Sequence, residues 1–494
     1  MTATPRGTGT GSGGQAFQLP AGEALDVVRR ALAGDQAWVV GGALRDALIG
    51  RVPARPDIDI IIAGDPRAAA QRVRAAAGRG SAVFGLSDLF GAWRVVGPAG
   101  AWQVDVSALH ADGLEADLLA RDLTLNAIAQ PLAGGELEDP AGGAADLRGG
   151  VLRMVTAQAL EDDPLRVLRV ARLAAELGMA PEDATVAAAR ERAGGLARVA
   201  GERIFAELRG VIGAGRPAAA LALLEGLGAT AAVLPELVQL HGVEQTVYHH
   251  LDAHDHTLEV LELVAALERD PAPVVGDVYA EAVAALLREP LADELTRGGA
   301  LRWGALLHDI AKPRTRAVLE GGAVGFPGHD REGAAMAREI LTRMRASEKL
   351  RAHVAALARH HLRAGFMVHE RPLTRRAVHG YLVACGPVAA DVTLLSIADR
   401  MATRGRKAQE SIANHIEVVL PLLGDALAFH SGGPAPPLVR GDEVARAAGI
   451  EAGPQLGELL AELAAAQFAG EIKTAAEALE HARRVASPGP AAGA

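Results

Sequence analysis

Apolar and polar residues follow two different periodicities along this chain, and the change comes near residue 155. Before it, two stretches with helical spacing, "AGEALDVVRRALAG" and "PRAAAQRVRAAAG", accompany short β-branched or alternating runs. The runs that predict strands are "QAWVV", "DIDIII", "AWRVVG" and "WQVDVSAL". From about 155 onward nearly every segment has helical spacing, with breaks near 214–217, 270–276, 287–291 and 431–438. The pattern predicts an α+β protein in which strands are confined to residues 21–150.

The composition restricts the kinds of protein this can be. The 494 residues suggest several domains, and half of them are hydrophobic, which is enough for a sizeable core. A net charge of −10 argues against a wholly basic nucleic-acid coat but leaves room for a local basic groove. The single cysteine, Cys385, excludes an internal disulfide framework and a cysteine-rich zinc site. We see no apolar run near about 18 residues and no secretion signal, so we expect a cytoplasmic protein without a membrane span.

Two aspartates, Asp57 and Asp59, interrupt the apolar run "DIDIII". Side chains at i and i+2 of a strand point to the same face, so the two carboxylates project together while Ile58 and Ile60 face the core. Carboxylates held this close repel one another unless a cation lies between them, and Mg²⁺ prefers such oxygen ligands. Asp105, on a later predicted strand, is a candidate third carboxylate for a two-metal site. The simpler alternative is that both aspartates are only solvated.

A paired glycine lies at the end of the predicted strand that precedes these aspartates. Gly41 and Gly42 are followed by the predicted helix "ALRDALIG". Such a turn lets backbone N–H groups approach a phosphate, and the helix N-terminus adds positive potential. Arg45, in the first turn, can reach the same anion. This neighbourhood favours a metal and phosphate site over two solvated aspartates.

Together, "GGALRDALIG" and "DIDI" resemble the head motif of class II tRNA nucleotidyltransferases and bacterial poly(A) polymerases. The resemblance implies a nucleotidyltransferase-fold head with a small mixed β-sheet. It also implies that Asp57 and Asp59 are the metal-binding catalytic pair. Gly41, Gly42 and Arg45 would then hold the triphosphate of the nucleotide.

A second segment, "ARDLTLNAIA" at 120–129, looks like a further motif of the same family. This match implies that Arg121, Asp122 and Asn126 lie at the ribose and phosphates of the nucleotide. Position 120 is Ala where the family commonly has a first Arg. Taken alone, Asp122 and Asn126 at i and i+4 are ordinary helix-cap chemistry.

The segment "EDDPLRVLRVARLAAELG", residues 161–178, reads as one helix and resembles the family pattern Glu/Asp-Asp-x-x-Arg-x-x-Arg. We predict that Asp163, Arg166 and Arg169 share one helical face. The Watson–Crick edges of CTP and ATP both present an amino donor beside a ring-nitrogen acceptor, whereas GTP and UTP present the reverse. Asp163 can accept from the amino group and Arg166 can donate to the ring nitrogen, so the pair can select C and A without a nucleic-acid template. The alternative is a surface ion pair worth a few tenths of a kcal/mol.

Histidines and aspartates recur through the middle of the chain, in "YHHLDAHDHTLE", "LLHDIAKPRT", "GHDREGA", "ARHHLRAG" and "LLSIADR". A His-Asp doublet near a helix end, with further His and Asp on other helices, suits a divalent metal site inside a bundle. The pattern resembles the HD superfamily of metal-dependent phosphohydrolases. The resemblance implies four ligands for a divalent metal, which are His256, His308, Asp309 and Asp399. It places His329 and His361 at a second metal or a substrate phosphate, while Lys312 and Arg314 offer phosphate contacts.

These resemblances run over nearly the whole chain past residue 20 and imply a domain order. The expected segments are a disordered tail (1–20), the nucleotidyltransferase head (21–150), a helical neck for base recognition (151–235), an HD metal-binding helical domain (236–425) and a C-terminal helical tail (426–494).

The expected activity is template-independent addition of C and A residues to the 3′ end of tRNA. The expected partners are tRNA, CTP and ATP, without a membrane, and the expected cofactors are Mg²⁺ in the head and a divalent metal in the HD domain. The oligomeric state is left open. Alternatives within the family are A-adding, CC-adding and poly(A) enzymes. Alternatives outside it are an HD phosphohydrolase with a nucleotide-sensing head and a non-catalytic RNA-binding protein.

Overall fold

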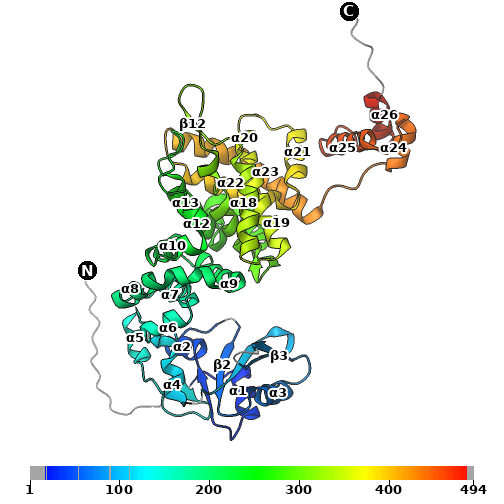
Figure 1. Cartoon of the computed structure of the whole chain (residues 1–494). Helices are drawn as coiled ribbons and strands as arrows, with labels where there is room; N and C mark the ends of the chain where they lie inside the picture. The colour runs from blue at the N-terminus through cyan, green and yellow to red at the C-terminus, as the bar shows by residue number, and fades with distance from the viewer. Residues whose placement is uncertain (1–16, 18, 54, 88–90, 111, 487–494) are drawn as a thin grey trace, which may run out of the picture. The chain divides into compact units, whose positions relative to one another are not determined.

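The computed structural model describes residues 17–486 except 18, 54, 88–90 and 111, and the chain divides into two compact units. The first comprises Met1–Ala197 and Leu227–Ala229, and the second comprises Arg198–Gly226 and Thr230–Ala494. The longer strands gather in the blue N-terminal part of the chain in Figure 1, whereas the green-to-red remainder is mostly helical. Most of the predicted tail lies outside the described residues, and the domain boundaries predicted at 150, 235 and 425 stay predictions.

The first unit is built around a six-stranded sheet with the order β3-β4-β5-β2-β1-β6. β2 runs parallel to β5, and the other neighbouring pairs are antiparallel. The strands are β1 (Ala37–Val40), β2 (Asp57–Ile62), β3 (Ala82–Ser87), β4 (Ala92–Val96), β5 (Gln103–Ala108) and β6 (Ala129–Pro131). The small mixed sheet and the α+β class are therefore confirmed.

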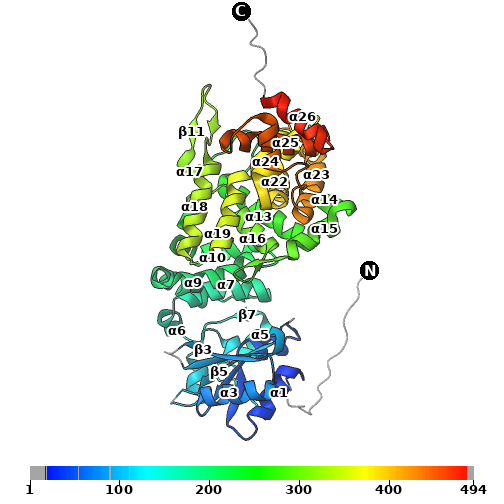
Figure 2. The same cartoon turned by 90° about the vertical axis from the view of Figure 1, so that its right-hand side faces the viewer.

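Helices pack against this sheet through short apolar faces. α3 (Pro66–Ala77) lies across β4 and β5 and also packs against α1 (Glu23–Ala31), as Figure 2 shows. α3 begins after Asp65, whose carboxylate accepts a hydrogen bond from a backbone N–H of the first turn, and a proline occupies its first position. Ile61 shares a strand face with Asp57 and Asp59 and belongs to a core that includes α4 (Leu114–Leu119). α4 is thus a neighbour of the face that carries the two aspartates.

Two strands, β3 and β6, are not predicted by the apolar pattern. Both lie at the edges of the sheet. β3 leaves Phe84 and Leu86 exposed, and β6 has only three residues. Because an edge strand pairs on one side only, it needs little of the apolar alternation that identifies an interior strand.

The first unit ends in a series of short helices. They are α5 (Gly143–Gly149), α6 (Ala157–Asp162), α7 (Leu165–Leu177) and α8 (Asp183–Arg192). α7 buries an apolar stripe that includes Leu168, Val170 and Leu173.

The second unit is a helical bundle. α13 packs against α16 and α22, and α19 packs against both α16 and α18. Its main helices are α9 (Gly201–Ile212), α10 (Pro217–Gly226), α12 (Pro235–Val238), α13 (Ala253–Arg269), α15 (Asp277–Arg288), α16 (Arg297–Leu307), α18 (His329–Arg343), α19 (Glu348–His360), α21 (Arg375–Cys385), α22 (Ala389–Ala402) and α23 (Ala408–Gly432). Trp303, Leu306 and Leu357 are fully buried where these helices meet. The large buried core fixes the ends of α13, α16 and α22, from which the metal-ligand candidates project.

The C-terminal helices form a small cluster of their own. They are α24 (Gly441–Ala448), α25 (Pro454–Phe468) and α26 (Ala475–Ala486). Val444, Leu459 and Ala482 are among the residues buried between them.

Two helical stretches, Arg375–Ala402 and Ala408–Gly432, are long and apolar enough to cross a membrane by length and composition alone. The expectation that no such run exists is therefore wrong at the level of sequence. The most apolar window of the first stretch is 78% buried and that of the second is 33% buried. Burial in the bundle explains the composition of the first, because the core helix of a folded domain meets the same criterion as a membrane span.

Candidate functional sites

The turn between β1 and α2 (Gly42–Leu48) lies directly against the carboxylate of Asp59. Gly41, at this turn, has a φ of 72°, which non-glycine residues rarely adopt. A Cβ at Gly41 would lie 2.6 Å from Asp59 Oδ2 and 3.7 Å from Arg121 Nη1. Glycine is therefore required here both by the backbone conformation and by the close approach of the carboxylate.

Asp57 and Asp59 lie on the same face of β2 and carry unbalanced negative charge. Burial and the neighbouring charge of Asp57 together raise the pKa of Asp59 to about 6, against the opposing charge of Arg121. Burial also raises the pKa of Asp57. A hydrogen bond with Gln103 opposes this increase, and the charge of Asp105 adds to it. Both carboxylates are thus unfavourable as anions without a cation, and their oxygen donors fit a divalent metal.

Asp105 is brought beside this pair by the sheet register. It lies opposite Asp59 across the parallel β2–β5 ladder and opposite Arg94 across the antiparallel β4–β5 ladder. Arg94 donates from Nε and Nη2 to the two carboxylate oxygens of Asp105, at 2.7 Å each. Asp105 is therefore adjacent to the pair, but its charge is already compensated by an arginine.

Arg45 is buried and joins the helix after the glycine turn to the 120–129 segment. Its Nε donates to Asp46 Oδ1 at 2.9 Å, and its Nη1 donates to Asn126 Oδ1 at 3.0 Å. Arg121 contacts the backbone carbonyl of Asn126 and the carboxylate of Asp117, at 3.4 and 3.5 Å. The structure thus brings together the two segments that the resemblance assigned to one nucleotide site.

Asp122 connects the same network to α7. Its Oδ1 accepts from Asn126 Nδ2 at 3.0 Å, and its Oδ2 accepts from Arg169 Nη1 at 2.9 Å. Burial by itself would raise the pKa of Asp122, but the charge and hydrogen bond of Arg169 hold it below its ordinary value. Asp122 is therefore an anion that fixes α7 to the head.

The segment 161–178 is two helices, so the prediction of one continuous helix is wrong. α6 ends at Asp162 and α7 begins at Leu165, and Asp163 between them has an extended conformation. The cause is Pro164, because the residue before a proline disfavours the helical conformation. Asp163 Oδ1 accepts from Leu165 N at 3.2 Å, which closes a turn just before α7.

Arg166 and Arg169 lie on α7, whereas Asp163 precedes it, so the three do not share one helical face. Arg166 Nη1 donates to the carbonyls of Ala120 and Ala159, at 3.0 and 3.1 Å. Arg166 therefore also connects α7 to the 120–129 segment.

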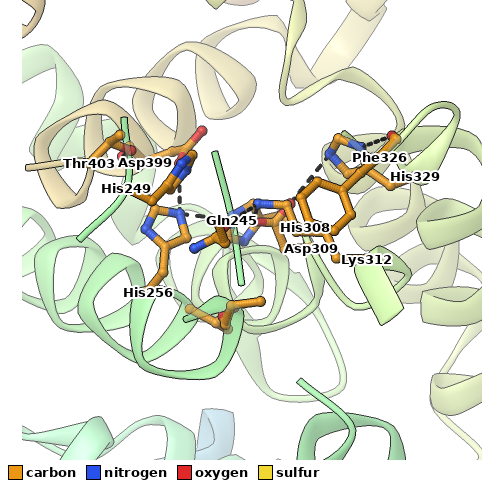
Figure 3. Close-up of polar contacts among 12 residues, drawn as sticks. Gln245, His249, His256, His308, Asp309, Lys312, Phe326, His329, Asp399 and Thr403 are labelled. Atoms are coloured by element: carbon orange, nitrogen blue, oxygen red, sulfur yellow. Dashed lines mark hydrogen bonds and ion pairs between the residues drawn. The ribbon is translucent and has the colours of Figure 1, made fainter. Parts of the chain in front are cut away.

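Six histidine and aspartate side chains of the second unit converge from α13, the end of α16, α18, the end of α19 and α22. Figure 3 labels all of them except His361. They form two groups of three. Within each group, the potential ligand atoms all lie within 4.8 Å of one another. The first group is His256, His308 and Asp399, and the second is Asp309, His329 and His361. The structure thus brings together all six side chains expected from the HD resemblance, but it groups Asp309 with His329 and His361 instead of with the other three expected ligands of the first metal.

The distances within these groups are those of an ion-pair network. His256 Nε2 lies 3.0 Å from Asp399 Oδ1 and 3.9 Å from Asp309 Oδ2. His308 Nε2 lies 3.1 Å from Asp309 Oδ2, and His329 Nε2 lies 3.2 Å from His361 Nε2. Asp309 lies at the centre of the network, in contact with both groups.

Backbone carbonyls fix the orientation of three of these imidazole rings. The Nδ1 atoms of His308, His329 and His361 each lie 2.7 Å from the carbonyl oxygen three residues earlier. With Nδ1 as the donor, Nε2 is the nitrogen of each ring that faces the cluster. Burial lowers the pKa of His308, but the charge and hydrogen bond of Asp309 raise it overall, so Nε2 of that ring must lose a proton before it can bind a metal.

Charged neighbours decide the protonation of the aspartates in the cluster. Burial would raise the pKa of Asp309, but His308 and Lys312 hold it well below its ordinary value. Burial would likewise raise the pKa of Asp399, and its hydrogen bond with His256 lowers it instead. Burial and the charge of His308 lower the pKa of His361 to about 4. Anionic oxygens and a neutral imidazole are the donors that a divalent transition metal accepts.

Lys312 does not lie free for a phosphate as expected. Its Nζ lies 2.6 Å from Asp309 Oδ2 and also donates to Gln245 Oε1. Arg314 pairs with Glu332 at 3.2 Å in an exposed position. The expected phosphate contacts are therefore engaged with protein groups.

A cavity of about 1340 Å³ opens onto the cluster. Its lining includes Asp309, His329, His361 and Asp399. Four arginines also line it, at positions 359, 363, 371 and 400. The cavity is large enough for an anionic substrate beside the cluster.

Three family models match the chain, in the head-to-HD order that the sequence motifs predict. A model described as the poly A polymerase head domain matches residues 100–153, and one described as the probable RNA and SrmB-binding site of polymerase A matches 178–240. The HD domain model matches residues 253–403. The A-adding tRNA nucleotidyltransferase of Deinococcus radiodurans is 36% identical, over 92% of this chain and 96% of the relative. The chain belongs to the tRNA nucleotidyltransferase family.

Two further relatives and one solved structure are also similar to this chain. The CC-adding tRNA nucleotidyltransferase of Thermus thermophilus is 34% identical, over 90% of this chain and 92% of the relative. The multifunctional CCA protein of Xanthomonas campestris is 32% identical, over 86% and 96%. The solved structure of the Bacillus stearothermophilus CCA-adding enzyme in complex with CTP covers 94% of this chain and 97% of its own, with a TM-score of 0.60 and 24% identity. The family inferred from the head motif and the HD resemblance is confirmed, and the chain is a member of a family of enzymes.

Several residues of this tRNA nucleotidyltransferase's sites are not found by sequence reasoning. Arg94 is missed because only the strand register places it opposite Asp105. Gln245 and His249 line the HD cluster (Figure 3), and burial followed by the charge of Lys312 lowers the pKa of His249 to about 4. The one sequence signal for His249 is its place in the histidine-rich segment "YHHLDAHDH".

Proposed function

We propose that this chain adds C and A residues to the 3′ end of tRNA, using CTP and ATP and releasing pyrophosphate. The observation that carries the proposal is the pair of carboxylates of Asp57 and Asp59, whose pKa values are raised and of which Asp59 lies against the Gly41 turn. Family members named as A-adding, CC-adding and multifunctional CCA enzymes support the same reaction class.

In this proposal Asp57 and Asp59 hold Mg²⁺, which when bound supplies Lewis-acid stabilisation of the triphosphate's negative charge. The N–H groups that follow Gly41 face the phosphates, since the turn has no side chain to obstruct them. Arg45 keeps this turn in place through Asn126. Asp105 is assigned a weaker role at the metal, because Arg94 already compensates its charge.

Base selection is assigned to Asp163 and Arg166. Arg166 uses Nη1 for its two backbone contacts, and a guanidinium has further N–H donors at Nε and Nη2 for a ring nitrogen. Asp163 lies two residues before the start of α7, so a base reaches it at the helix end rather than along a helical face. Arg169 is a support in this proposal, because its contact with Asp122 holds α7 to the head.

The test uses three RNA substrates, which are tRNA without its 3′ CCA, tRNA ending in C and tRNA ending in CC. Each is incubated with each nucleoside triphosphate separately and with CTP and ATP together, and product length is read on a gel. We expect extension of the first substrate by CCA. Extension of none of the three would contradict the proposal.

Partial addition is the second candidate, favoured by the A-adding and CC-adding relatives at 36% and 34% identity. An A-adding enzyme extends only tRNA ending in CC, and a CC-adding enzyme stops before A. The same gel separates these outcomes from complete CCA addition. tRNA, CTP and ATP are the proposed partners in each case, and a cytoplasmic location stays a prediction.

We also propose that the HD cluster binds a divalent metal and hydrolyses phosphate esters. The supporting observation is the convergence of both histidine–aspartate groups at a cavity of about 1340 Å³ with four arginines in its lining. p-Nitrophenyl phosphate and bis-p-nitrophenyl phosphate, each with Mn²⁺, Co²⁺ or Ni²⁺, test monoester and diester hydrolysis. Loss of the activity in His308→Ala with retention in Asp57→Ala would assign it to this site, and equal activity in His308→Ala would contradict the assignment.

A further inference from the structure

A second group of metal-ligand side chains lies outside the HD cluster. Glu225 ends α10, His241 lies in the turn after α12, and His254 lies in the first turn of α13. Their potential ligand atoms all lie within 4.8 Å of one another. His241 Nε2 lies 2.7 Å from Glu225 Oε1, and His254 Nε2 lies 3.8 Å from Glu225 Oε2. Three separate segments thus bring two imidazoles and a carboxylate to one point.

The two imidazole rings are held in a defined arrangement. The rings of His241 and His254 stack with centroids 3.6 Å apart and planes 25° apart. Because each nitrogen lone pair lies in its own ring plane, the exposed His241 ring must turn out of this stack to share an ion with His254. His254 is buried, and its Nδ1 lies 3.0 Å from Asp255 Oδ1. A hydrogen bond from Nδ1 to a carboxylate leaves Nε2 with its lone pair toward Glu225, as in the carboxylate–histidine–metal arrangement of known metal sites.

Asp252 fixes the backbone on both sides of this group. Its Oδ1 accepts from Asp255 N at 2.9 Å, and its Oδ2 accepts from Gly242 N at 2.7 Å. The turn that carries His241 is therefore fastened to the start of α13, which carries His254. The relative position of the two histidines does not depend on their stacking alone.

This group is distinct from the HD cluster, although α13 contributes to both. His256, two residues after His254, contacts Asp399 of the HD cluster. Side chains two apart on a helix point to different sides, so His254 and His256 serve different groups.

We propose that Glu225, His241 and His254 form a second site for a zinc-type divalent ion, namely Zn²⁺, Co²⁺ or Ni²⁺. An imidazole–imidazole–carboxylate set suits these ions. Ligand atoms about 2.1 Å from a tetrahedral ion lie about 3.4 Å apart. The observed separations of 2.7 and 3.8 Å from Glu225 fall on either side of that value. The ion would fasten α10 and the turn at His241 to the start of α13.

The site is open to solvent on one side. The side chains of His241 and Glu225 are 42% and 37% exposed, whereas His254 is 6% exposed. An ion can therefore enter without unfolding, and a water can complete its coordination. His241→Ala is accordingly the variant least expected to disturb the fold.

The test measures zinc bound per full-length chain after equilibrium dialysis, by elemental analysis, in wild type and in His241→Ala. His250→Ala is the matched control, because His250 lies in the same segment, is 39% exposed and is also near a glutamate, at 3.8 Å. We expect His241→Ala to bind one zinc fewer than wild type and His250→Ala to bind the same number. Equal zinc content in wild type and His241→Ala would overturn the proposal and leave only a histidine–glutamate hydrogen bond.

Two further variants keep the result decisive. Glu225→Gln retains the size of the side chain and is expected to lose the same zinc. Asp255→Asn is expected to weaken zinc binding at this site by roughly 10-fold, as replacement of a group that orients a ligand does elsewhere. Zinc should raise the thermal midpoint of His250→Ala more than that of His241→Ala, and equal shifts would also count against the site.

Discussion

The two charged sites of this chain differ in how their carboxylates are compensated. In the head, burial raises the pKa values of Asp57 and Asp59. The charge of Asp105 adds to this at Asp57, and the charge of Asp57 adds to it at Asp59, where Arg121 opposes. In the HD cluster, Asp309 is more deeply buried than either of them, yet His308 and Lys312 hold its pKa well below its ordinary value.

This difference predicts different responses to metal. A cation in the head relieves repulsion that no protein group fully compensates, so metal and nucleotide should bind there readily. In the HD cluster a metal must displace protons from imidazoles and compete with the amine of Lys312, at 2.6 Å from Asp309. The head should therefore depend on its metal for charge balance, whereas the HD cluster has cations of its own.

The largest expected effect separates the two sites. Asp59→Ala should lower incorporation of CTP and ATP into tRNA by roughly 10³-fold or more, since metal stabilisation of developing charge is worth several kcal/mol. The thermal midpoint should stay the same or rise, because a carboxylate with an unfavourable charge is removed. Single-turnover incorporation and calorimetry measure the two quantities. His308→Ala is the control and should keep full incorporation; a similar loss in both variants would mean that the sites are not independent.

The next effect concerns base selection beside the head. Asp163→Asn keeps an oxygen that can accept from Leu165 N but replaces the other carboxylate oxygen by a donor. Discrimination of CTP over UTP and of ATP over GTP should fall roughly 10- to 100-fold, because an unpaired polar group costs about 1–3 kcal/mol. The ratios of kcat/KM for each nucleotide pair measure this. Unchanged ratios would remove Asp163 from the proposed recognition pair.

A third prediction uses pH to sharpen the contrast in the head. Asp59 is protonated below a pKa of about 6 in the folded protein, and only its anion binds metal. The Mg²⁺ concentration for half-maximal incorporation should therefore rise about tenfold for each pH unit below 6 and stay level above 6. The same pKa also affects the stability of the metal-free protein, which should be greater at low pH than at high pH. The pKa is higher in the folded state than in the unfolded state, so the unfolding free energy falls as pH rises from about 4 to 6. A half-maximal Mg²⁺ concentration that does not change between pH 5 and 6 would contradict the assignment.

The smallest effect tests the internal cation of the HD cluster. Lys312→Gln removes the amine that pairs with Asp309 and keeps a side chain of similar length. Divalent-metal affinity at the cluster should rise a few-fold, while the thermal midpoint without metal should fall because Asp309 loses a partner. Titration calorimetry and thermal unfolding, each with and without Mn²⁺, measure this. Incorporation of CTP and ATP should not change, and weaker metal binding would mean that Lys312 supports the metal instead of competing with it.

Much of the fold and of both sites is predictable from the sequence because it depends on local pattern. The turn at Gly41, the strand with Asp57 and Asp59, and the helices of the second unit each follow from a short run of residues. The break before Leu165 is also a local effect, because Pro164 causes it. The apolar spacing on both sides of Pro164 nevertheless favours the prediction of one continuous helix. The edge strands are less predictable, because they carry little apolar alternation.

The residue types at the turn, on the aspartate-bearing strand and at the His-Asp doublet can be read from the chain alone, and they limit the chemistry that each segment can perform. Their partners depend on the fold, as in the contacts of Arg94 with Asp105, of Arg169 with Asp122 and of Lys312 with Asp309. Strand and helix periodicity act over a few residues, whereas these pairs depend on sheet register and packing between distant segments. The charge state of each carboxylate, and with it the affinity for a metal, follows from those distant partners.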